Sequence, residues 1–586
     1  MRKKTSLAFF IGICIVVTLT LFVPAGVSSS AAASQAASVA PSTSSSDSAS
    51  LEARVDALFK PWSGLDTPGA AVAIVKDGMV VYRKGFGSAQ LEYGIPITPS
   101  TVFHVASVSK QFTAMTITML EAEGKLSTAD DVRKYLPDLP DFGTPITIDH
   151  FLHHISGMRD QWELLIMSGW PLENVITQEH ILDILKHQRD LNFPPGKQYL
   201  YCNSGFTLLA EIAAKAGGKP FTELTQEKIF RPLGMTSTHF HLDPREIVRN
   251  RAYSYDGDAK TGFRQSLLNY ANVGATSLFT TVEDMANWLR NFDEKRVGGA
   301  AVIERLLAKG KLSDGTEIPY ARGISWGEYR GLKTIGHGGA DAGFRSAVTY
   351  FPGERFGVAV FSNLGSFGPG EIVLRIADIY LADKLAPAPA AGTGKFARPE
   401  IKMSPKELAA FAGTYWIETT KLLRKVVLEK DKLFYVRSNE NRSEMVPVSR
   451  TEFQLKDIPA EAIVSFTEKT GARFDMITVT VSGQPTVVGK WTEPYAPAGD
   501  ALKELIGRYE SAELGTRYEL VVKPEGLWIR LGHGDEAPLE PAIKDFFSIG
   551  GDQDIRVQFL RAADGTVKAM TVTTGRAWNG KFDRAK

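Results

Sequence analysis

The chain has 586 residues, of which 44% are hydrophobic and 23% are charged, and this is enough apolar material for several globular cores. Its 67 Lys and Arg residues nearly balance 66 Asp and Glu residues, and the formal net charge of +1 gives no overall bias toward nucleic acid. The two cysteines are Cys14 and Cys202. If an N-terminal segment carrying Cys14 is removed, no intramolecular disulfide can form, so stability must come from burial.

Residues 1–33 are typical of a secretory signal peptide. A basic stretch at residues 2–4 precedes an almost wholly apolar run over residues 7–23, and small residues at 31–33 offer a cleavage site. The apolar run is long for a signal, so an uncleaved N-terminal membrane anchor is the alternative. Residues 34–50, rich in Ser and Ala, are expected to form a disordered spacer. We therefore expect an exported protein, periplasmic or secreted.

Ser107 and Lys110 lie three residues apart where the sequence predicts the start of a helix. Turn-prone residues 98–101 come before them, apolar residues recur after them, and Gly124 supplies a stop. The spacing places the hydroxyl and the amine on one helical face. Unpaired N–H groups at a helix N-terminus stabilise negative charge near the serine oxygen. Lys110 could then accept a proton if burial or a cationic neighbour lowers its pKa, whereas an N-cap serine beside an exposed lysine is the structural alternative.

Two further motifs follow in chain order. Tyr201 and Asn203 come after a turn at residues 194–196, and the His-Gly-Gly-Ala run at residues 337–340 precedes a strand-like run at residues 346–351. The order Ser-x-x-Lys, Tyr-x-Asn, His-x-Gly resembles the penicillin-recognising serine hydrolases, a superfamily of β-lactamases, DD-peptidases, esterases and D-aminopeptidases.

Other segments match that superfamily in the same order. A segment that reads Leu-His-His-Ile-Ser-Gly-Met begins at Leu152, a Pro-Leu-Gly-Met turn at Pro232, and a helix at Thr280. The resemblance covers residues 51–385 and is nearest to the three-domain bacterial D-aminopeptidase type. It implies an α+β fold, with a β-lactamase-like/transpeptidase-like catalytic domain made of an antiparallel sheet flanked by helices.

The sequence beyond residue 385 predicts two all-β domains. A linker at residues 386–402 carries prolines and small residues that cannot build a core. Short alternating strands then predict domains at residues 403–497 and 498–586, each of a length that suits a small closed barrel. Two openings look alike, at residues 407–415 and 503–509. The resemblance likewise implies two small lipocalin-like barrels.

The resemblance also implies the roles of the nucleophile and of the groups that handle its proton. Ser107 would attack a carbonyl to give an acyl-enzyme that water hydrolyses. Lys110 and Tyr201 would handle the proton, and either could take it first. Asn203 would bind a substrate amide or hold Lys110 in place, and its structural alternative is a turn residue.

The His-Gly-Gly-Ala run would complete the site. The backbone N–H groups of Ser107 and Ala340 would form the oxyanion hole, and Gly338 and Gly339 would let the backbone approach the substrate. β-Lactamases and DD-peptidases usually have lysine where this chain has His337, which is mostly neutral at pH 7. This favours aminopeptidase, amidase or esterase activity over β-lactam hydrolysis. If His337 must be neutral, activity should fall below about pH 6.5.

The other histidines predict no metal site, and no cofactor is expected. His150, His153 and His154 could share an ion at helical spacing, but they lie in the structural segment that the resemblance covers. His239 and His241 lie in a predicted strand, and we expect their side chains to point to opposite faces and to share no site.

The leading prediction is an exported, metal-independent serine hydrolase that cleaves a small amide or peptide, best described as a D-aminopeptidase. An esterase or DD-carboxypeptidase/β-lactamase-like hydrolase is the first alternative, and a non-catalytic sensor that is acylated or binds ligand is the second. The expected partners are a small peptide, amide or ester substrate and cell-wall fragments. We expect no nucleic-acid partner, and a membrane only through an uncleaved signal. A last-barrel loop at residues 532–536 could reach the active site, or be a plain surface hairpin.

Overall fold

The computed structural model describes residues 45–387 and 398–585, apart from residues 439–440, 457, 459–460, 482–485, 498, 533 and 551. The expected signal peptide lies outside the described residues, as does most of the expected linker. Helix α2 (Ser45–Phe59) begins inside the segment expected to be disordered, so residues 45–50 are helical. Within the described ranges, no helix combines the length and the apolar character that a membrane crossing needs.

Contacts divide the chain into two compact units. One takes in the described residues up to Trp162 together with Pro171–Ala386, and the other takes in Pro387–Lys586 together with Glu163–Trp170. The short segment Glu163–Trp170 therefore groups with the C-terminal unit although it lies well inside the predicted catalytic range, residues 51–385.

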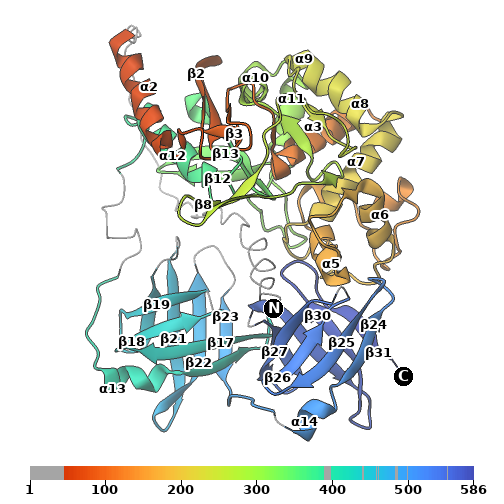
Figure 1. Cartoon of the computed structure of the whole chain (residues 1–586), viewed down its shortest axis with the longest axis vertical. Helices are drawn as coiled ribbons and strands as arrows, with labels where there is room; N and C mark the ends of the chain where they lie inside the picture. Colours follow the sequence, from red (N-terminus) through yellow and green to blue (C-terminus); the bar gives the residue numbers. More distant parts are fainter. Residues whose placement is uncertain are drawn as a thin grey trace. The chain divides into compact units, whose positions relative to one another are not determined.

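The first unit is built on a six-stranded antiparallel sheet in the order β12-β13-β14-β15-β1-β2 (Figure 1). Its strands are β1 (Ala70–Lys76), β2 (Met79–Phe86), β12 (Ser325–Tyr329), β13 (Leu332–Asp341), β14 (Phe344–Phe351) and β15 (Phe356–Ser362). β1 joins an N-terminal hairpin to a C-terminal meander by pairing with β15. The continuous apolar run of β1 follows from this position, because a central strand with both faces covered has no solvent side.

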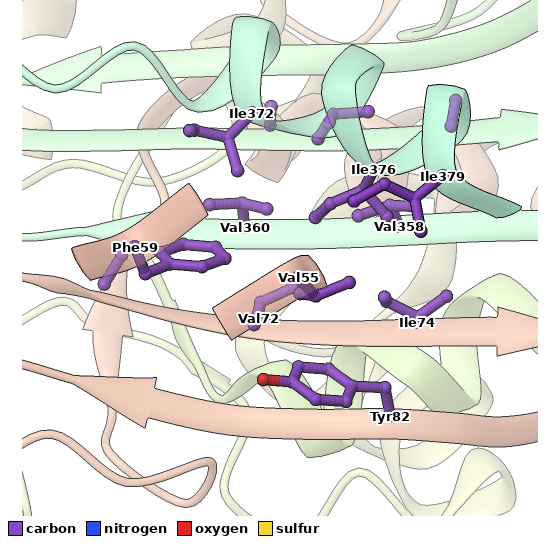
Figure 2. Packing of buried hydrophobic residues seen from close by; sticks show 14 of the residues in the cluster. Val55, Phe59, Val72, Ile74, Tyr82, Val358, Val360, Ile372, Ile376 and Ile379 are labelled. Carbon is purple, nitrogen blue, oxygen red and sulfur yellow. The ribbon is translucent and has the colours of Figure 1, made fainter. Parts of the chain in front are cut away.

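Helices cover both faces of the sheet. Figure 2 shows α2 and α12 (Pro369–Tyr380) over one face, where Val72 and Val360 meet Phe59 and Ile376. Each such side chain, when fully buried, contributes about 1.5–3 kcal/mol relative to an exposed one. The alternate residues of β1, such as Ala73, point to the other face, which packs against α10 (Val282–Glu294).

The site-bearing elements lie beside this sheet. Strand β5 (Phe103–His104) leads into a 3₁₀ turn, η2 (Ala106–Val108), and then into α3 (Ser109–Ala122). A small antiparallel sheet has the order β5-β11-β7, with β11 (Leu278–Thr280) between β5 and β7 (His239–Phe240). The remaining helices of this unit are α4 (Ile148–Leu152), α6 (Gln178–Lys186), α7 (Asn203–Gly217), α8 (Phe221–Thr225), α9 (Arg231–Leu233) and α11 (Gly299–Leu306), and most of α5 (Gln161–Ser168) belongs to the other unit.

The second unit contains two closed, eight-stranded antiparallel barrels, as predicted. The first runs through β16 (Gly413–Ile417), β17 (Leu422–Glu429), β18 (Lys432–Val436), β19 (Arg442–Pro447), β20 (Glu452–Leu455), β21 (Ala462–Thr470), β22 (Arg473–Val481) and β23 (Val487–Trp491). The second runs through β24 (Gly507–Ser511), β25 (Thr516–Lys523), β26 (Gly526–Arg530), β27 (Glu536–Ile543), β28 (Phe546–Ile549), β29 (Asp552–Arg561), β30 (Val567–Thr573) and β31 (Gly580–Arg584). Closure leaves no free sheet edge, because β16 pairs with β23 and β24 pairs with β31.

The repeated opening seen in the sequence forms the same structure twice. A short helix, α13 (Pro405–Leu408) or α14 (Asp500–Lys503), precedes the first strand of each barrel. The buried Tyr415 hydroxyl donates to the carbonyl of Phe411 at 3.2 Å, and the buried Tyr509 hydroxyl donates to the carbonyl of Leu505 at 2.9 Å. In both barrels the tyrosine thus satisfies a carbonyl four residues before it.

Candidate active site

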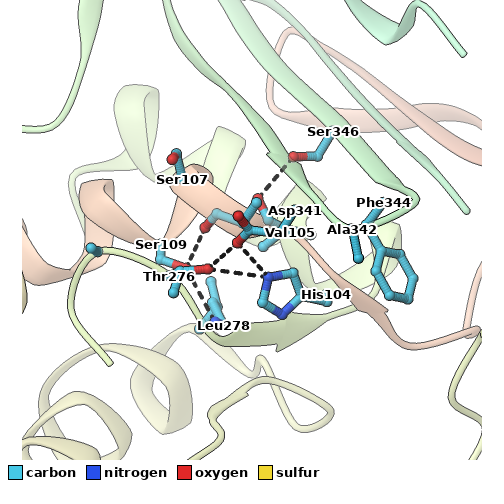
Figure 3. A network of polar contacts seen from close by, with 12 residues as sticks. His104, Val105, Ser107, Ser109, Thr276, Leu278, Asp341, Ala342, Phe344 and Ser346 are labelled. Carbon is cyan, nitrogen blue, oxygen red and sulfur yellow. Dashed lines mark hydrogen bonds and ion pairs between the residues drawn. The ribbon is translucent and has the colours of Figure 1, made fainter. Parts of the chain in front are cut away.

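Ser107 lies in the η2 turn between β5 and α3. The residue before it, Ala106, has a φ of +48°, a conformation that costs free energy for a residue with a Cβ. Ser109 holds this turn, because its hydroxyl donates to the Ala106 carbonyl at 2.5 Å and accepts from the Leu278 N–H at 3.1 Å (Figure 3). Ser107 itself remains half-buried, so its hydroxyl is presented at a fixed and strained turn.

Lys110 is fully buried, and its Nζ atom lies 3.0 Å from Ser107 Oγ. The same Nζ atom donates to Asn203 Oδ1 and to the Ala275 carbonyl, each at 2.8 Å. Both oxygens can only accept hydrogen bonds, so each takes one N–H group of the Lys110 amine. In a neutral amine the remaining tetrahedral position of Nζ is a lone pair, which then faces Ser107 Oγ. The geometry therefore suits Lys110 to take the Ser107 proton.

Asn203 is the first residue of α7, and it is held by a carboxylate that the sequence analysis missed. Oδ2 of the fully buried Asp160 accepts from the backbone N–H of Asn203 at 2.7 Å and from its Nδ2 at 2.8 Å. Since the amide NH₂ is committed to Asp160, the amide oxygen faces Lys110. No local pattern marks Asp160, because it acts through a residue 43 positions later in the chain.

Tyr201 lies beside the same lysine. Lys110 Nζ is 4.9 Å from the centroid of the Tyr201 ring, and the centroid of the His154 ring is 4.3 Å from it. Tyr201 also packs against the cluster formed by Ile155, Ile318 and Tyr320. The fold thus brings Tyr201 beside Ser107 and Lys110, which are far from it in the sequence, so that three of the four predicted catalytic residues lie together.

His337 contacts the wall of the site through both ring nitrogens. Its Nδ1 atom lies 2.6 Å from the Gly338 carbonyl, which can only accept, so Nδ1 carries the proton. Nε2 of the neutral ring then accepts from the Tyr320 hydroxyl at 3.0 Å. Burial and the neighbouring Lys110 lower the pKa of His337 to about 3. The expectation that its protonation would reduce activity below about pH 6.5 is therefore wrong, because the folded protein moves that titration far into acid.

The predicted oxyanion strand lies against the serine turn. β12 pairs with β13 only as far as Gly336. From His337 onward, η2 contacts β13 along the edge that β12 leaves unpaired. A Cβ on Gly339 would lie 2.3 Å from the Val105 carbonyl oxygen, whereas a Cβ on Gly338 would meet nothing nearer than 3.5 Å. Gly339 is therefore the glycine that this approach requires.

A polar network fixes the far end of β13. His104 Nε2 lies 2.9 Å from Asp341 Oδ2, and the Thr276 hydroxyl contacts both side chains (Figure 3). The Ser346 hydroxyl also donates to the Val105 carbonyl at 2.8 Å. His104 lies just before the serine turn, and Asp341 directly follows Ala340. These contacts therefore fix the position of Ala340 relative to Ser107.

The three clustered histidines make separate contacts with the protein. His150 Nδ1 accepts from the Thr147 N–H, which caps α4, and His154 Nδ1 accepts from the Cys202 N–H. The expectation for the other pair is wrong. The rings of His239 and His241 lie 5.8 Å apart, because strand residues two positions apart share a face.

Comparison with known proteins shows relatives of this chain in sequence and fold. The chain matches a D-aminopeptidase of Gluconobacter oxydans at 36% identity over 313 residues, 53% of this chain and 58% of that protein. It matches a D-aminopeptidase of Brucella anthropi at 31% identity over 315 residues, 54% of this chain and 59% of that protein. These alignments span less than two thirds of either relative.

A solved structure shows the same fold at low sequence identity. The octameric penicillin-binding protein homologue from Pyrococcus abyssi covers 76% of this chain and 99% of its own, with a TM-score of 0.51 and 23% identity. The fold class is thus that of the penicillin-binding proteins and their relatives. The Beta-lactamase family model matches residues 55–383, more than half of the chain, and the chain belongs to that family.

Proposed function

We propose that this chain is a serine hydrolase that cleaves small amides through an acyl-enzyme and acts as a D-aminopeptidase. The observation that carries the proposal is the position of the buried Lys110 amine. Asn203 Oδ1 and the Ala275 carbonyl accept hydrogen bonds from it, and its Nζ atom lies 3.0 Å from Ser107 Oγ. A serine becomes a nucleophile when a positioned base takes its proton, and this arrangement supplies the base.

In the proposed acylation, Ser107 Oγ attacks the carbonyl carbon while its proton passes to neutral Lys110. The oxyanion of the tetrahedral intermediate accepts hydrogen bonds from the N–H groups of Ser107 and Ala340. Collapse breaks the C–N bond, and the leaving amine takes the proton back from Lys110, with Tyr201 beside the pair as the second proton carrier. Water then attacks the acyl-enzyme in the reverse sense, giving the acid and restoring Ser107.

The choice of substrate class rests on His337 and on the relatives. A neutral imidazole engaged by Tyr320 and Gly338 offers no fixed cation to a substrate carboxylate, which disfavours penicillins and C-terminal carboxylates as substrates. Two relatives, 31% and 36% identical to this chain, are named D-aminopeptidase. An N-terminal D-amino acid amide or short peptide fits both observations.

We also propose that the protein is exported to the periplasm or secreted. The support is the basic, then apolar, then small-residue order of residues 1–33. Fractionation of cells that produce the full chain tests this. Protein found with the cytoplasmic fraction and retaining its first 33 residues would contradict export.

The activity is tested by steady-state release of p-nitroaniline from the D-alanine and L-alanine anilides, beside p-nitrophenyl acetate and nitrocefin. We expect turnover of the D-anilide, loss of turnover in Ser107→Ala, and full activity in the matched control Ser100→Ala, whose side chain is exposed. Turnover of the ester alone would move the protein to the esterases. A single burst of product followed by stable acylation would identify the acylated sensor.

A further inference from the structure

A second group of chemically active side chains lies on the β5-β11-β7 sheet, outside the proposed active site. Phe279 of β11 pairs with His104 on one side and with His239 on the other. The backbone N–H of His241 donates to the Ser277 carbonyl at 2.9 Å, so the strand pairing extends one step past β7. His239 and His241 therefore lie on the same face, and the ring of Phe279 packs against both.

Three of the four nitrogen atoms of these two imidazoles are buried without hydrogen-bond partners among the described residues. This is true of His239 Nε2 and of both ring nitrogens of His241, a residue only 1% exposed. A buried polar atom without a partner costs about 1–3 kcal/mol, so native structures rarely leave one unexplained. Three such atoms at neighbouring positions indicate a binding site for a ligand that accepts lone pairs from nitrogen.

We propose that His239, His241 and Glu246 form a binding site for a divalent transition-metal ion of the zinc type. Each residue offers one ligand atom, and these three atoms lie within 4.8 Å of one another. Two imidazoles and a carboxylate are a donor set that Zn²⁺ accepts, with a fourth position left for water. Zinc bonds of about 2.0–2.2 Å need closer ligand atoms, so the site must contract on binding.

Glu246 is the residue able to make that contraction. Its side chain is 59% exposed, and its Oε2 atom lies 3.7 Å from His241 Nδ1. It stands in the segment between β7 and Arg251, which carries no regular strand or helix and can therefore adjust its side chains at low cost. The imidazoles, in contrast, are set by strand pairing and by the Phe279 ring.

The charges around the site are mixed. The Arg251 guanidinium lies 4.9 Å from the centroid of the Phe279 ring, and its charge opposes a bound cation. Glu246 is the carboxylate that offsets it, since Asp243 is already paired with Arg245. Removing the charge of Glu246 should therefore weaken metal binding more than the loss of one ligand atom alone.

The proposed ion would have a structural role. It would link the segment after β7 to the β5-β11-β7 sheet, which also carries His104 just before the serine turn. No step of the proposed hydrolysis passes through His239, His241 or Glu246, so metal binding should change stability and leave the chemical step alone.

The test uses the full chain, freed of metal by a chelator and titrated with ZnCl₂ by calorimetry. We expect one equivalent of Zn²⁺ per chain, a raised melting temperature, and visible d–d absorption when Co²⁺ replaces Zn²⁺. Glu246→Gln should weaken binding about 10-fold or more, and His239→Gln should abolish it. His187→Gln is the matched control, because its side chain is 53% exposed and remote in sequence from the site.

Two outcomes would overturn the proposal. One is a wild-type chain that takes up no stoichiometric Zn²⁺ or Co²⁺. The other is binding that stays unchanged in Glu246→Gln and His239→Gln, since the ion would then lie elsewhere. His241→Asn is a weaker test, because replacing a fully buried ring could unfold the sheet, whereas Glu246 is at the surface and its variant should fold normally.

Discussion

The carboxylate of Asp160 holds Asn203 in one orientation. A single oxygen, Oδ2, accepts from the backbone N–H and from the side-chain amide of Asn203, at 2.7 and 2.8 Å. The amide oxygen is thereby left to Lys110. A buried carboxylate thus helps to set the direction of the lysine amine through Asn203.

Replacing Asp160 should change turnover more than substrate binding. In Asp160→Ala the buried amide NH₂ of Asn203 loses its acceptor, which costs about 1–3 kcal/mol of stability, and the amide becomes free to turn its NH₂ toward Lys110. We expect kcat to fall about 10–100-fold with a small change in KM. Asp160→Asn keeps an oxygen acceptor and should recover part of the loss. Steady-state kinetics with the exposed Asp138→Ala as control decide this, and equal losses in both Asp160 variants would argue against positioning.

Lys110 should be indispensable as a base and not only as a cation. Lys110→Met and Lys110→Arg should each lower kcat about 10²–10⁴-fold, since a guanidinium keeps its proton and a thioether accepts none. Single-turnover acylation, measured by mass spectrometry of the acylated chain, reports the step directly. The exposed Lys125→Met is the control. An arginine variant with near-normal acylation would show that another group, such as Tyr201, takes the proton.

The two neighbouring glycines should respond differently to a methyl group. In Gly339→Ala the new Cβ would lie 2.3 Å from the Val105 carbonyl, so β13 must move away from the serine turn. We expect kcat to fall about 10²–10³-fold, as when an oxyanion donor is lost. Gly338→Ala adds a Cβ at an ordinary distance of 3.5 Å and should retain most of the activity. The same kinetic assay applied to both variants tests this, and an equal loss would remove the steric argument.

His337 should make stability, rather than activity, sensitive to acid. Its pKa is about 3 in the folded protein and about 6.5 when unfolded, because burial and Lys110 oppose its charge. The unfolded chain therefore binds the proton first, and the free energy of unfolding should decrease as the pH falls from about 6.5 toward about 3. The kcat/KM profile should show no loss from His337 above pH 5.

Urea unfolding measured between pH 7 and pH 4.5 tests this expectation. His337→Gln should flatten the decrease in stability over that range, whereas the exposed His187→Gln should leave it unchanged. His154, next to Tyr201, also has a lowered pKa through burial and contributes its own share, so the slope should be reduced and not abolished. An unchanged slope in His337→Gln would contradict the lowered pKa of this ring.

Much of the architecture could be predicted from local patterns. The Ser-x-x-Lys spacing places Ser107 and Lys110 on one side of a helical turn, which allows the approach of 3.0 Å between Nζ and Oγ. The repeated openings before Tyr415 and Tyr509 likewise predicted two similar domains, because the same local sequence forms the same tyrosine contact in each. The helix at residues 45–50 was missed, since a Ser- and Ala-rich composition resembles a spacer.

The prediction that His239 and His241 point to opposite faces was wrong for a different reason. The strand itself was predicted, but side chains two residues apart in a strand point to the same face. Glu246 could not be added from sequence in any case, because its approach depends on the irregular segment after β7.

The sequence by itself determined which groups are available, in what order, and which neighbours share a helical turn or a strand face, because these depend on backbone periods of a few residues. Only the tertiary structure decided that Asp160 orients Asn203, that the Ala275 carbonyl holds Lys110, and that burial beside Lys110 keeps His337 neutral. These relationships join residues that are not neighbours in the chain, and their distances follow from the packing of whole elements that no local pattern encodes.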